Sequence, residues 1–421
     1  MRRRFPKSPA TKCSAHTLNV VCDASLAGTA EHAQNPRQNH KWSSDFVRGM
    51  HPGLKVSAGV ATRLNLLLLT AVLLAGFAYA QDAKDTRVIR IGAGPIGNTD
   101  FPFGGLVANA ISNPPGSRDC DRGGNCGVPG LIAVAQTTGD VADNLRAVSR
   151  GDVEMGLAQA DIAAWAYQGT AAFGDQEPLS NLRVLARLYP ENVHLVARQD
   201  SGIKDITGLK GKKVAMGPEG SGTAATAKLI LSAYGVKWTG VQMKYMAFSA
   251  MPEAFASGAV DAAFIVSGAP TLAVEDVASR IPIRLVPITG PAADKLVQVF
   301  PFYSKGVIPA GTYAGQSAVE TIDVGSVLVS RDTMDPDLAY GIVRAIWHER
   351  NIPLFQAGHP RGKVMERAAA AQDFGVPVQS GADRYYVQNG LMDPAAAVPP
   401  PKAPVKAPAK AERSVPGASR S

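Results

Sequence analysis

The sequence predicts an α/β protein built from two lobes. From Arg87 onward, short runs of aliphatic residues alternate with longer segments of helical periodicity, as in α/β folds with mainly parallel sheets. The chain has 421 residues, of which 46% are hydrophobic and 19% charged, so it is too long for one compact domain and too apolar for a disordered chain. The apolar run at 320–331 would return the chain to the first lobe, and two crossings between lobes predict a hinge.

The predicted elements alternate regularly through both lobes. We expect the first lobe over residues 81–195, the second over 196–328 and a return to the first over 329–393. Apolar runs bounded by turn residues predict strands, and amphipathic segments predict helices. The predicted strands are 88–94, 131–137, 153–158, 182–189, 192–198, 212–217, 243–248, 260–266, 283–288 and 320–331. The predicted helices are 104–112, 142–150, 162–168, 220–235, 251–258 and 335–350.

The net charge of +8 belongs to the two ends of the chain. Residues 1–80 carry +7 and residues 394–421 carry +4, which leaves −3 for residues 81–393. Because a nucleic-acid-binding body needs a basic surface, this distribution argues against a nucleic-acid partner. The segment 394–421 is rich in Pro, Ala and Lys and cannot bury a core, so it predicts a disordered or polyproline tail.

An uncharged apolar run of 13 residues at 66–78 predicts a signal peptide over residues 50–80. Ala78-Tyr79-Ala80 has the small-x-small pattern of a cleavage site, so we expect cleavage after Ala80 and a periplasmic mature protein. A membrane anchor is the alternative, but a spanning helix needs about 20 apolar residues.

The stretch upstream of this signal is basic and of low complexity. Met50 would begin a signal peptide of ordinary length, so we expect residues 1–49 to be a start-site artefact. Arg2-Arg3-Arg4 allows a twin-arginine signal instead, although the apolar run begins some sixty residues later.

Of the four cysteines, only Cys120 and Cys126 follow the expected cleavage site. They flank the turn-rich segment DRGGN, and two cysteines six residues apart around such a turn can reach disulfide geometry. A metal site is the alternative, but it needs more ligands, and we expect none of the body's histidines near this loop. Those histidines are His194, His348 and His359. We therefore expect a disulfide and no metal.

Residues 92–97 read GAGPIG, a literal G-x-G-x-x-G directly after a predicted strand. A dinucleotide site requires a helix that begins inside the motif and a second strand that ends in an acidic residue about 20 positions on. Here Pro102 falls within the would-be helix, and NPPGSRDCDRGG stands where the second strand should end. We therefore interpret the motif as a glycine-rich ligand loop and expect no cofactor.

Gly220-Ser221-Gly222-Thr223 follows a predicted strand and begins a helix. Free N–H groups and two hydroxyls at a helix N-terminus attract a carboxylate or a phosphate. Ordinary N-capping by Ser221 or Thr223 is the alternative, and both interpretations can hold. No Gly-Lys-Ser/Thr follows Gly217, so this is not a Walker A loop.

Polar side chains stand at the carboxyl ends of predicted strands, where open α/β sheets bind ligands. Gln159 and Asp161 follow one strand, Ser267 follows a strand of the second lobe, and Asn144 lies near the start of a helix. Asp161 is also a candidate helix cap. The sequence has no G-x-S-x-G elbow, no H-E-x-x-H and too few histidines for a catalytic triad, so it predicts a binder without catalytic residues.

Eight short motifs in a fixed order resemble the TAXI class of solute-binding proteins, which serve tripartite ATP-independent periplasmic (TRAP) transporters. The motifs are Gly104-Gly105, Thr138-Gly139…Asn144-Leu145, Gly151-Asp152…Gln159-Ala160-Asp161, Leu188-Tyr189-Pro190-Glu191, residues 209–214 (LKGKKV), Gly220-Ser221-Gly222-Thr223, Gly258…Val260-Asp261-Ala262 and Gly268…Pro270. The resemblance covers nearly all of residues 87–350.

This resemblance implies a type II periplasmic-binding fold that closes on a small organic anion, a dicarboxylate or an acidic amino acid. It further implies a monomer that delivers the solute to TRAP membrane subunits. The implied contacts are Gly94, Asn98, Thr99, Phe101, Asn144, Gln159 and Asp161 in the first lobe and Ser221, Gly222, Thr223 and Ser267 in the second. Two departures from the family pattern occur: Asp140-Val141 replaces a Gly-Ser pair, and Phe101 replaces a tyrosine.

We expect the anionic group of the solute at Ser221-Gly222-Thr223, with Asn144 and Gln159 holding its other end, so that binding needs both lobes. Two other classes stay open. A binding protein for an ATP-driven importer or a sensor would have much the same sequence. A secreted flavin- or NAD-dependent oxidoreductase is the enzymatic alternative.

Overall fold

The computed structural model describes residues 86–372 and 375–393. The predictions of a start-site artefact at 1–49, a signal peptide at 50–80 and a tail at 394–421 lie outside these residues. Within the described part of the chain, no helix is both long and apolar enough to span a membrane.

Twelve strands of the described residues form one mixed sheet. Their order is β3-β2-β4-β1-β5-β12-β6-β9-β7-β8, with β10 paired to β6 and β11 paired to β12. The strands are β1 (Arg87–Gly92), β2 (Ser112–Asn113), β3 (Val128–Pro129), β4 (Leu131–Gln136), β5 (Met155–Gln159), β6 (Leu182–Arg198), β7 (Lys213–Ala215), β8 (Gln242–Lys244), β9 (Ala262–Ser267), β10 (Ile283–Leu285), β11 (Tyr303–Ile308) and β12 (Val319–Arg331).

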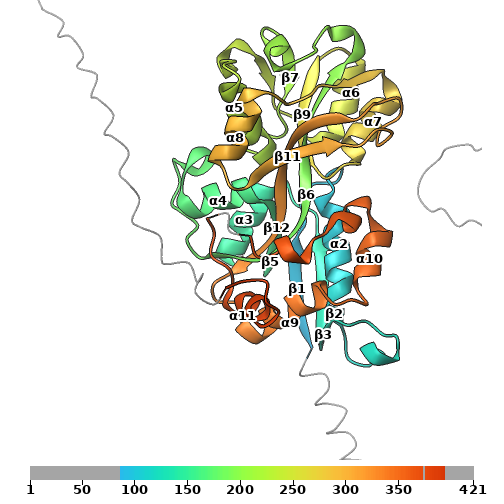
Figure 1. Ribbon diagram of the computed structural model, residues 1–421, viewed down its shortest axis with the longest axis vertical. Helices are drawn as coiled ribbons and strands as arrows, with labels where there is room; N and C mark the ends of the chain where they lie inside the picture. The colour runs from blue at the N-terminus through green and yellow to red at the C-terminus, as the bar shows by residue number, and fades with distance from the viewer. Residues whose placement is uncertain (1–85, 373–374, 394–421) are drawn as a thin grey trace, which may run out of the picture. The chain divides into compact units, whose positions relative to one another are not determined.

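Two strands of this sheet, β6 and β12, belong to both lobes. One part of β6 pairs with β12 up to Asn192, and the rest pairs with β9 from Asn192 to Ala197. Likewise β12 pairs with β11 up to Val324 and with β5 from Ser326. Figure 1 shows these two antiparallel strands running together from one group of elements into the other. The predicted fold class, a two-lobed α/β fold with two hinge crossings, is confirmed.

Helices complete the two lobes on either side of the crossing. The first lobe contains α2 (Asp100–Ile111), α3 (Val141–Arg150), α4 (Ala160–Gln168), α9 (Pro336–Ile346), α10 (Ile352–Gly358) and α11 (Ser380–Gln388). The second contains α5 (Gly222–Ala233), α6 (Met251–Ala256), α7 (Leu272–Arg280) and α8 (Pro291–Val299). One buried apolar cluster runs from Ile162 on α4 to Ala224 on α5 and Phe264 on β9, so the lobes pack directly against each other on this side.

Two local predictions were wrong. The strands expected at 182–189 and 192–198 are one strand, because β6 continues through Pro190, which still pairs with Gly325 of β12; β9 takes over as the partner from Asn192. The helix expected from residue 104 begins at Asp100, with Pro102 in its first turn. Proline is tolerated there because first-turn N–H groups have no intrahelical acceptor, so Pro102 does not argue against a helix.

The disulfide between Cys120 and Cys126 is present, with a Cα–Cα distance of 4.7 Å. The expectation that no histidine lies near this loop was wrong. His348, just after α9, places its Nε2 3.9 Å from Cys120 Sγ. The nearby Arg350 side chain donates a hydrogen bond to the Cys120 carbonyl. Tertiary packing therefore brings together residues that lie more than 200 positions apart, which sequence spacing does not reveal.

Candidate functional site

The two lobes meet near the hinge strands along a set of buried polar residues, which we call the interlobe seam. Its first-lobe members are Asn98, Thr99, Asp140 and Gln159, and its second-lobe members are Ser221, Gly222, Thr223 and Ser267. Seven of these eight residues were predicted as ligand contacts. We describe the seam from the β9 side to the α5 side.

At the end of β9, Ser267 holds the loop that follows β1. The Thr99 N–H donates to Ser267 Oγ over 3.0 Å, and the Ser267 hydroxyl lies 3.0 Å from Asn98 Oδ1, to which it donates. Thr99 Oγ1 also donates to the Gly268 carbonyl over 2.6 Å. The three residues are almost fully buried. The glycine-rich loop of the first lobe thus contacts the second lobe directly, at a strand's carboxyl end.

At the N-terminus of α5, an acidic residue of the first lobe takes the place expected for an anion. Asp140 Oδ1 accepts the N–H of Gly222 over 3.0 Å and also the N–H of Ala142 over 3.0 Å. Ser221 caps the same helix by accepting the Ala224 N–H over 3.1 Å. Burial raises the pKa of Asp140 to about 6, although both N–H donors favour its charged form. Ser221 therefore caps α5, as the capping interpretation expected, and a protein carboxylate occupies the helix end at which we expect a solute anion.

Gly222 allows the lobes to touch. A Cβ at this position would lie 2.8 Å from Gln159 Oε1, 2.9 Å from Ile162 Cγ1 and 2.9 Å from Val141 Cγ2. All three atoms belong to the first lobe. The backbone of Gly222 is ordinary helix at the start of α5, so its conformation does not require glycine. The close approach of the two lobes does.

Beneath Gln159 lies a group of buried polar side chains that we call the acceptor cluster: Asp100, Gln159, Tyr189, Glu191 and Ser326. Tyr189 and Ser326 donate to Asp100 Oδ1 over 2.6 and 3.2 Å. Gln159 Nε2 donates to Glu191 Oε2 over 2.8 Å. The remaining oxygens, Asp100 Oδ2, Glu191 Oε1 and Gln159 Oε1, are buried and accept no hydrogen bond from an N–H or alcohol group of the described residues. The cluster thus offers acceptors and lacks donors.

Asp100 and Glu191 are hydrogen-bonded side chain to side chain, which requires a proton on one of the two carboxyls. Burial raises the pKa of Asp100. Burial, and then the charge of Asp100, raise the pKa of Glu191 well above its usual range. Two carboxyls this close cannot both ionise without a cation, so the pair holds one proton between them.

The other predicted contacts are occupied by bonds within the protein. Asn144 donates from Nδ2 to the Leu157 carbonyl over 2.8 Å and accepts from Thr138 Oγ1 over 2.6 Å. Asp161 accepts from the hydroxyls of Thr226 and Tyr303 over 2.8 and 2.7 Å. Asn144 therefore faces the strands of the first lobe, whereas Asp161 bonds to second-lobe elements.

The remaining predicted residues make fewer or longer hydrogen bonds. Gly94 accepts from the Thr138 N–H over 3.0 Å with a φ of 76°, which favours glycine. Thr223 Oγ1 accepts the Val266 N–H over 3.4 Å, within the second lobe. Phe101 is half-buried and packs on the first-lobe core.

Sequence reasoning missed a second network, on the hinge strands. Arg361 donates from Nη2 to Asn192 Oδ1 over 2.7 Å and from Nε to the Ala269 carbonyl over 2.6 Å. Asn192 in turn donates to Asp323 on β12 over 2.5 Å. Buried His194 contacts Tyr313 Oη over 2.9 Å, and burial lowers its pKa to about 4. No local pattern marks Arg361, which lies far along the chain from its partners.

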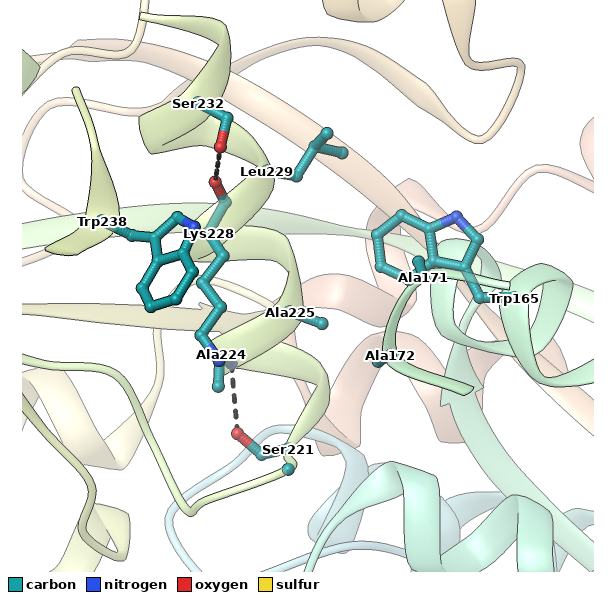
Figure 2. A pocket seen from close by; sticks show the side chains of 11 residues that line it. Trp165, Ala171, Ala172, Ser221, Ala224, Ala225, Lys228, Leu229, Ser232 and Trp238 are labelled. Atoms are coloured by element: carbon teal, nitrogen blue, oxygen red, sulfur yellow. Dashed lines mark hydrogen bonds between the residues drawn. The ribbon is translucent and has the colours of Figure 1, made fainter. Parts of the chain in front are cut away.

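A cavity of 420 Å³ opens beside the α5 end of the seam. Residues of both lobes line it: Trp165, Ala171 and Ala172 from the first, and Gly220, Ser221, Ala224, Ala225, Lys228, Leu229, Ser232 and Trp238 from the second. Figure 2 shows Trp165 on one side of α5 and Trp238 on the other, with the Lys228 side chain alongside Trp238. Lys228 Nζ lies 5.9 Å from the centre of the Trp238 ring, which leaves a cation at the cavity wall.

Comparison with solved structures finds likenesses at low identity and low TM-score. The periplasmic aliphatic sulphonate binding protein SsuA from Escherichia coli is 14% identical, with a TM-score of 0.39 over 73% of this chain and 94% of that one. A ligand-binding component of an ABC-type import system from Staphylococcus aureus is 13% identical, with a TM-score of 0.40 over 73% and 93%. The substrate-binding protein of an amino acid ABC transporter is 14% identical, with a TM-score of 0.38 over 65% and 100%.

Likenesses of this degree identify neither a solute nor a partner. The family model, by contrast, matches residues 91–390, which include both lobes, both hinge strands and the whole interlobe seam. This chain therefore belongs to the NMT1-like family.

Proposed function

We propose that this protein is an exported solute-binding protein that captures a small organic anion between its lobes and delivers it to a membrane importer. The observation that carries the proposal is the seam itself. Buried polar groups from two lobes face one another across two hinge strands, so that opening the hinge exposes them together. Ligand sites of this kind commonly lie where lobes meet.

The anionic class follows from Asp140. Its carboxylate accepts the Gly222 N–H at the start of α5, and we infer that it marks the position where a solute carboxylate would sit in its place. The adjoining cavity, with Lys228 in its wall, gives an anion a path to this helix end. The Cys120–Cys126 disulfide agrees with a location outside the cytoplasm.

Two membrane partners fit such a receptor. The family match and the hinge are compatible with both; we propose an ATP-driven importer and keep TRAP subunits as the alternative. An oxidoreductase is the weaker candidate, since the loop after β1 bonds to Ser267 and Gly268 of the other lobe.

A thermal-shift screen of the mature protein against small carboxylates tests binding. A true solute at about 100 times its Kd should add about 2.7 kcal/mol of stability. Absence of any shift across carboxylates, sulfonates and amino acids would refute the proposal. Uptake into vesicles that contain the membrane subunits, measured with and without ATP, separates the two partners.

A further inference from the structure

We propose that Asp100 Oδ2, Glu191 Oε1 and Gln159 Oε1 of the acceptor cluster form a subsite for a primary ammonium group of the solute, and that this group displaces the proton shared by Asp100 and Glu191. The inference rests on the proposed function and adds to it. A solute anion at the α5 end and a solute cation at the cluster would together require a zwitterion.

The first argument is the count of donors and acceptors. Asp100 Oδ2, Glu191 Oε1 and Gln159 Oε1 are buried and accept from no N–H or alcohol group among the described residues. One proton between the two carboxyls can satisfy Asp100 and Glu191, but the Gln159 oxygen is still unpaired. A buried acceptor without a donor costs free energy of the order of 1–3 kcal/mol. An ammonium group brings three donors for the three oxygens.

The second argument is the position of Gln159. Its amide nitrogen bonds to Glu191 Oε2, while its oxygen lies 2.8 Å from where a Cβ of Gly222 would be. The unpaired oxygen is therefore directed at the N-terminus of α5, where Asp140 occupies the proposed anion position. A small solute can reach both places at once when the hinge opens.

The third argument is the charge around the cluster. Tyr189 and Ser326 face Asp100 with hydroxyls, and Asp161 on α4 faces Glu191 with a further negative charge. These neighbours, together with Gln159, are neutral or acidic. The guanidinium of Arg361 also acts on Glu191 and Tyr189 through its charge, but its hydrogen bonds go to Asn192 Oδ1 and to the Pro190 and Ala269 carbonyls. In these surroundings the carboxyl pair keeps its proton while no solute is bound, and loses it only when a cation takes its place. The bound ammonium replaces that proton, and one proton passes to the solvent.

Matched acids with and without an amino group test the inference: glutarate and glutamate, succinate and aspartate, propionate and alanine. We expect the amino member of at least one pair to bind at least tenfold more tightly in calorimetry. Its binding enthalpy should also differ between phosphate and bis-Tris buffers at the same mildly acidic pH, because the released proton is taken up by buffers of different ionisation enthalpy. The member without nitrogen should give the same enthalpy in both buffers.

Glu191→Gln removes the charge while its amide N–H takes the place of the shared proton, so the variant should fold. We expect it to weaken binding of the amino member by roughly tenfold to a hundredfold, to leave the other member unchanged and to abolish proton release. Asp100→Asn is a second variant with the same expectation. Glu154→Gln is the control, since Glu154 pairs with Arg90 at the opposite end of β5.

The outcomes separate the two proposals. If acids without nitrogen bind as tightly as their amino partners, without proton release, the subsite is refuted and the proposed function stands. If Glu191→Gln weakens both members of a pair equally, the cluster acts on folding or closure and the subsite is again refuted. If no member of any pair binds, the proposed function fails, and the subsite fails with it.

Discussion

Replacing Gly222 with alanine should hold the lobes apart without harming either of them. The added Cβ would lie 2.8–2.9 Å from three atoms, of Val141, Gln159 and Ile162, all in the first lobe. Ordinary carbon contacts are about 3.5–4.0 Å, so these atoms must retreat by roughly 0.6 Å or more. Overpacking of this kind costs about 1–3 kcal/mol, which corresponds to a roughly 5- to 150-fold rise in Kd for a solute bound by closure.

Within its own helix, the same substitution is favourable. Alanine exceeds glycine in helix propensity by up to about 1 kcal/mol, and Gly222 has ordinary helical backbone, so α5 should fold normally. Calorimetry with an identified solute, together with small-angle scattering, measures the effect. Gly105→Ala on α2 is the matched control, because a Cβ there meets nothing within 4 Å. Wild-type affinity and wild-type scattering in Gly222→Ala would refute the closed seam described here.

Three further predictions concern stability. Burial raises the pKa of Asp140 to about 6, so the folded state binds this proton more tightly and the free energy of unfolding falls as pH rises from about 4 to about 6. In Asp140→Asn this fall, measured by denaturation at several pH values, should be smaller by up to roughly 3 kcal/mol. The same pH dependence in wild type and variant would contradict the prediction. Burial lowers the pKa of His194 to about 4, so the stability that the neutral imidazole contributes is present above pH 6.5 and is lost as pH falls toward 4. In His194→Gln the decrease in unfolding free energy over this pH range should be smaller by roughly 3 kcal/mol. An unchanged decrease would count against the prediction. Cys120→Ser with Cys126→Ser should cost about 2 kcal/mol in urea unfolding, whereas no loss would show that the loop constrains nothing.

The sequence was informative about the fold because buried strands and amphipathic helices leave periodic patterns. The strand predicted at 320–331 is β12, and the helix predicted at 220–235 contains α5. The division of β6 at Pro190 failed for a tertiary reason. Proline lacks an N–H, which usually ends a strand, but here Pro190 still pairs with Gly325 of β12, and β9 becomes the partner from Asn192. Which strand lies beside which is not written in a local pattern.

The candidate site was predictable where it depends on strand ends and helix starts. Thr99 bonds to Ser267, and Gly222 bonds to Asp140, each across the two lobes; contact of these residues with a solute stays a prediction. The two acidic residues of the acceptor cluster were not predicted as site residues, for a physical reason. Asp100 and Glu191 would be exposed on most proteins, and only the crossing of β5, β6 and β12 buries them together.

The central claim is that the lobes close on a small solute. Spin labels at Glu177 in the first lobe and Lys237 in the second, both exposed, report the distance between the lobes in the disulfide-bonded protein. A broad distribution without solute should become a single short distance when a compound that raises the melting temperature is added. A distribution that such a compound leaves unchanged would contradict the claim.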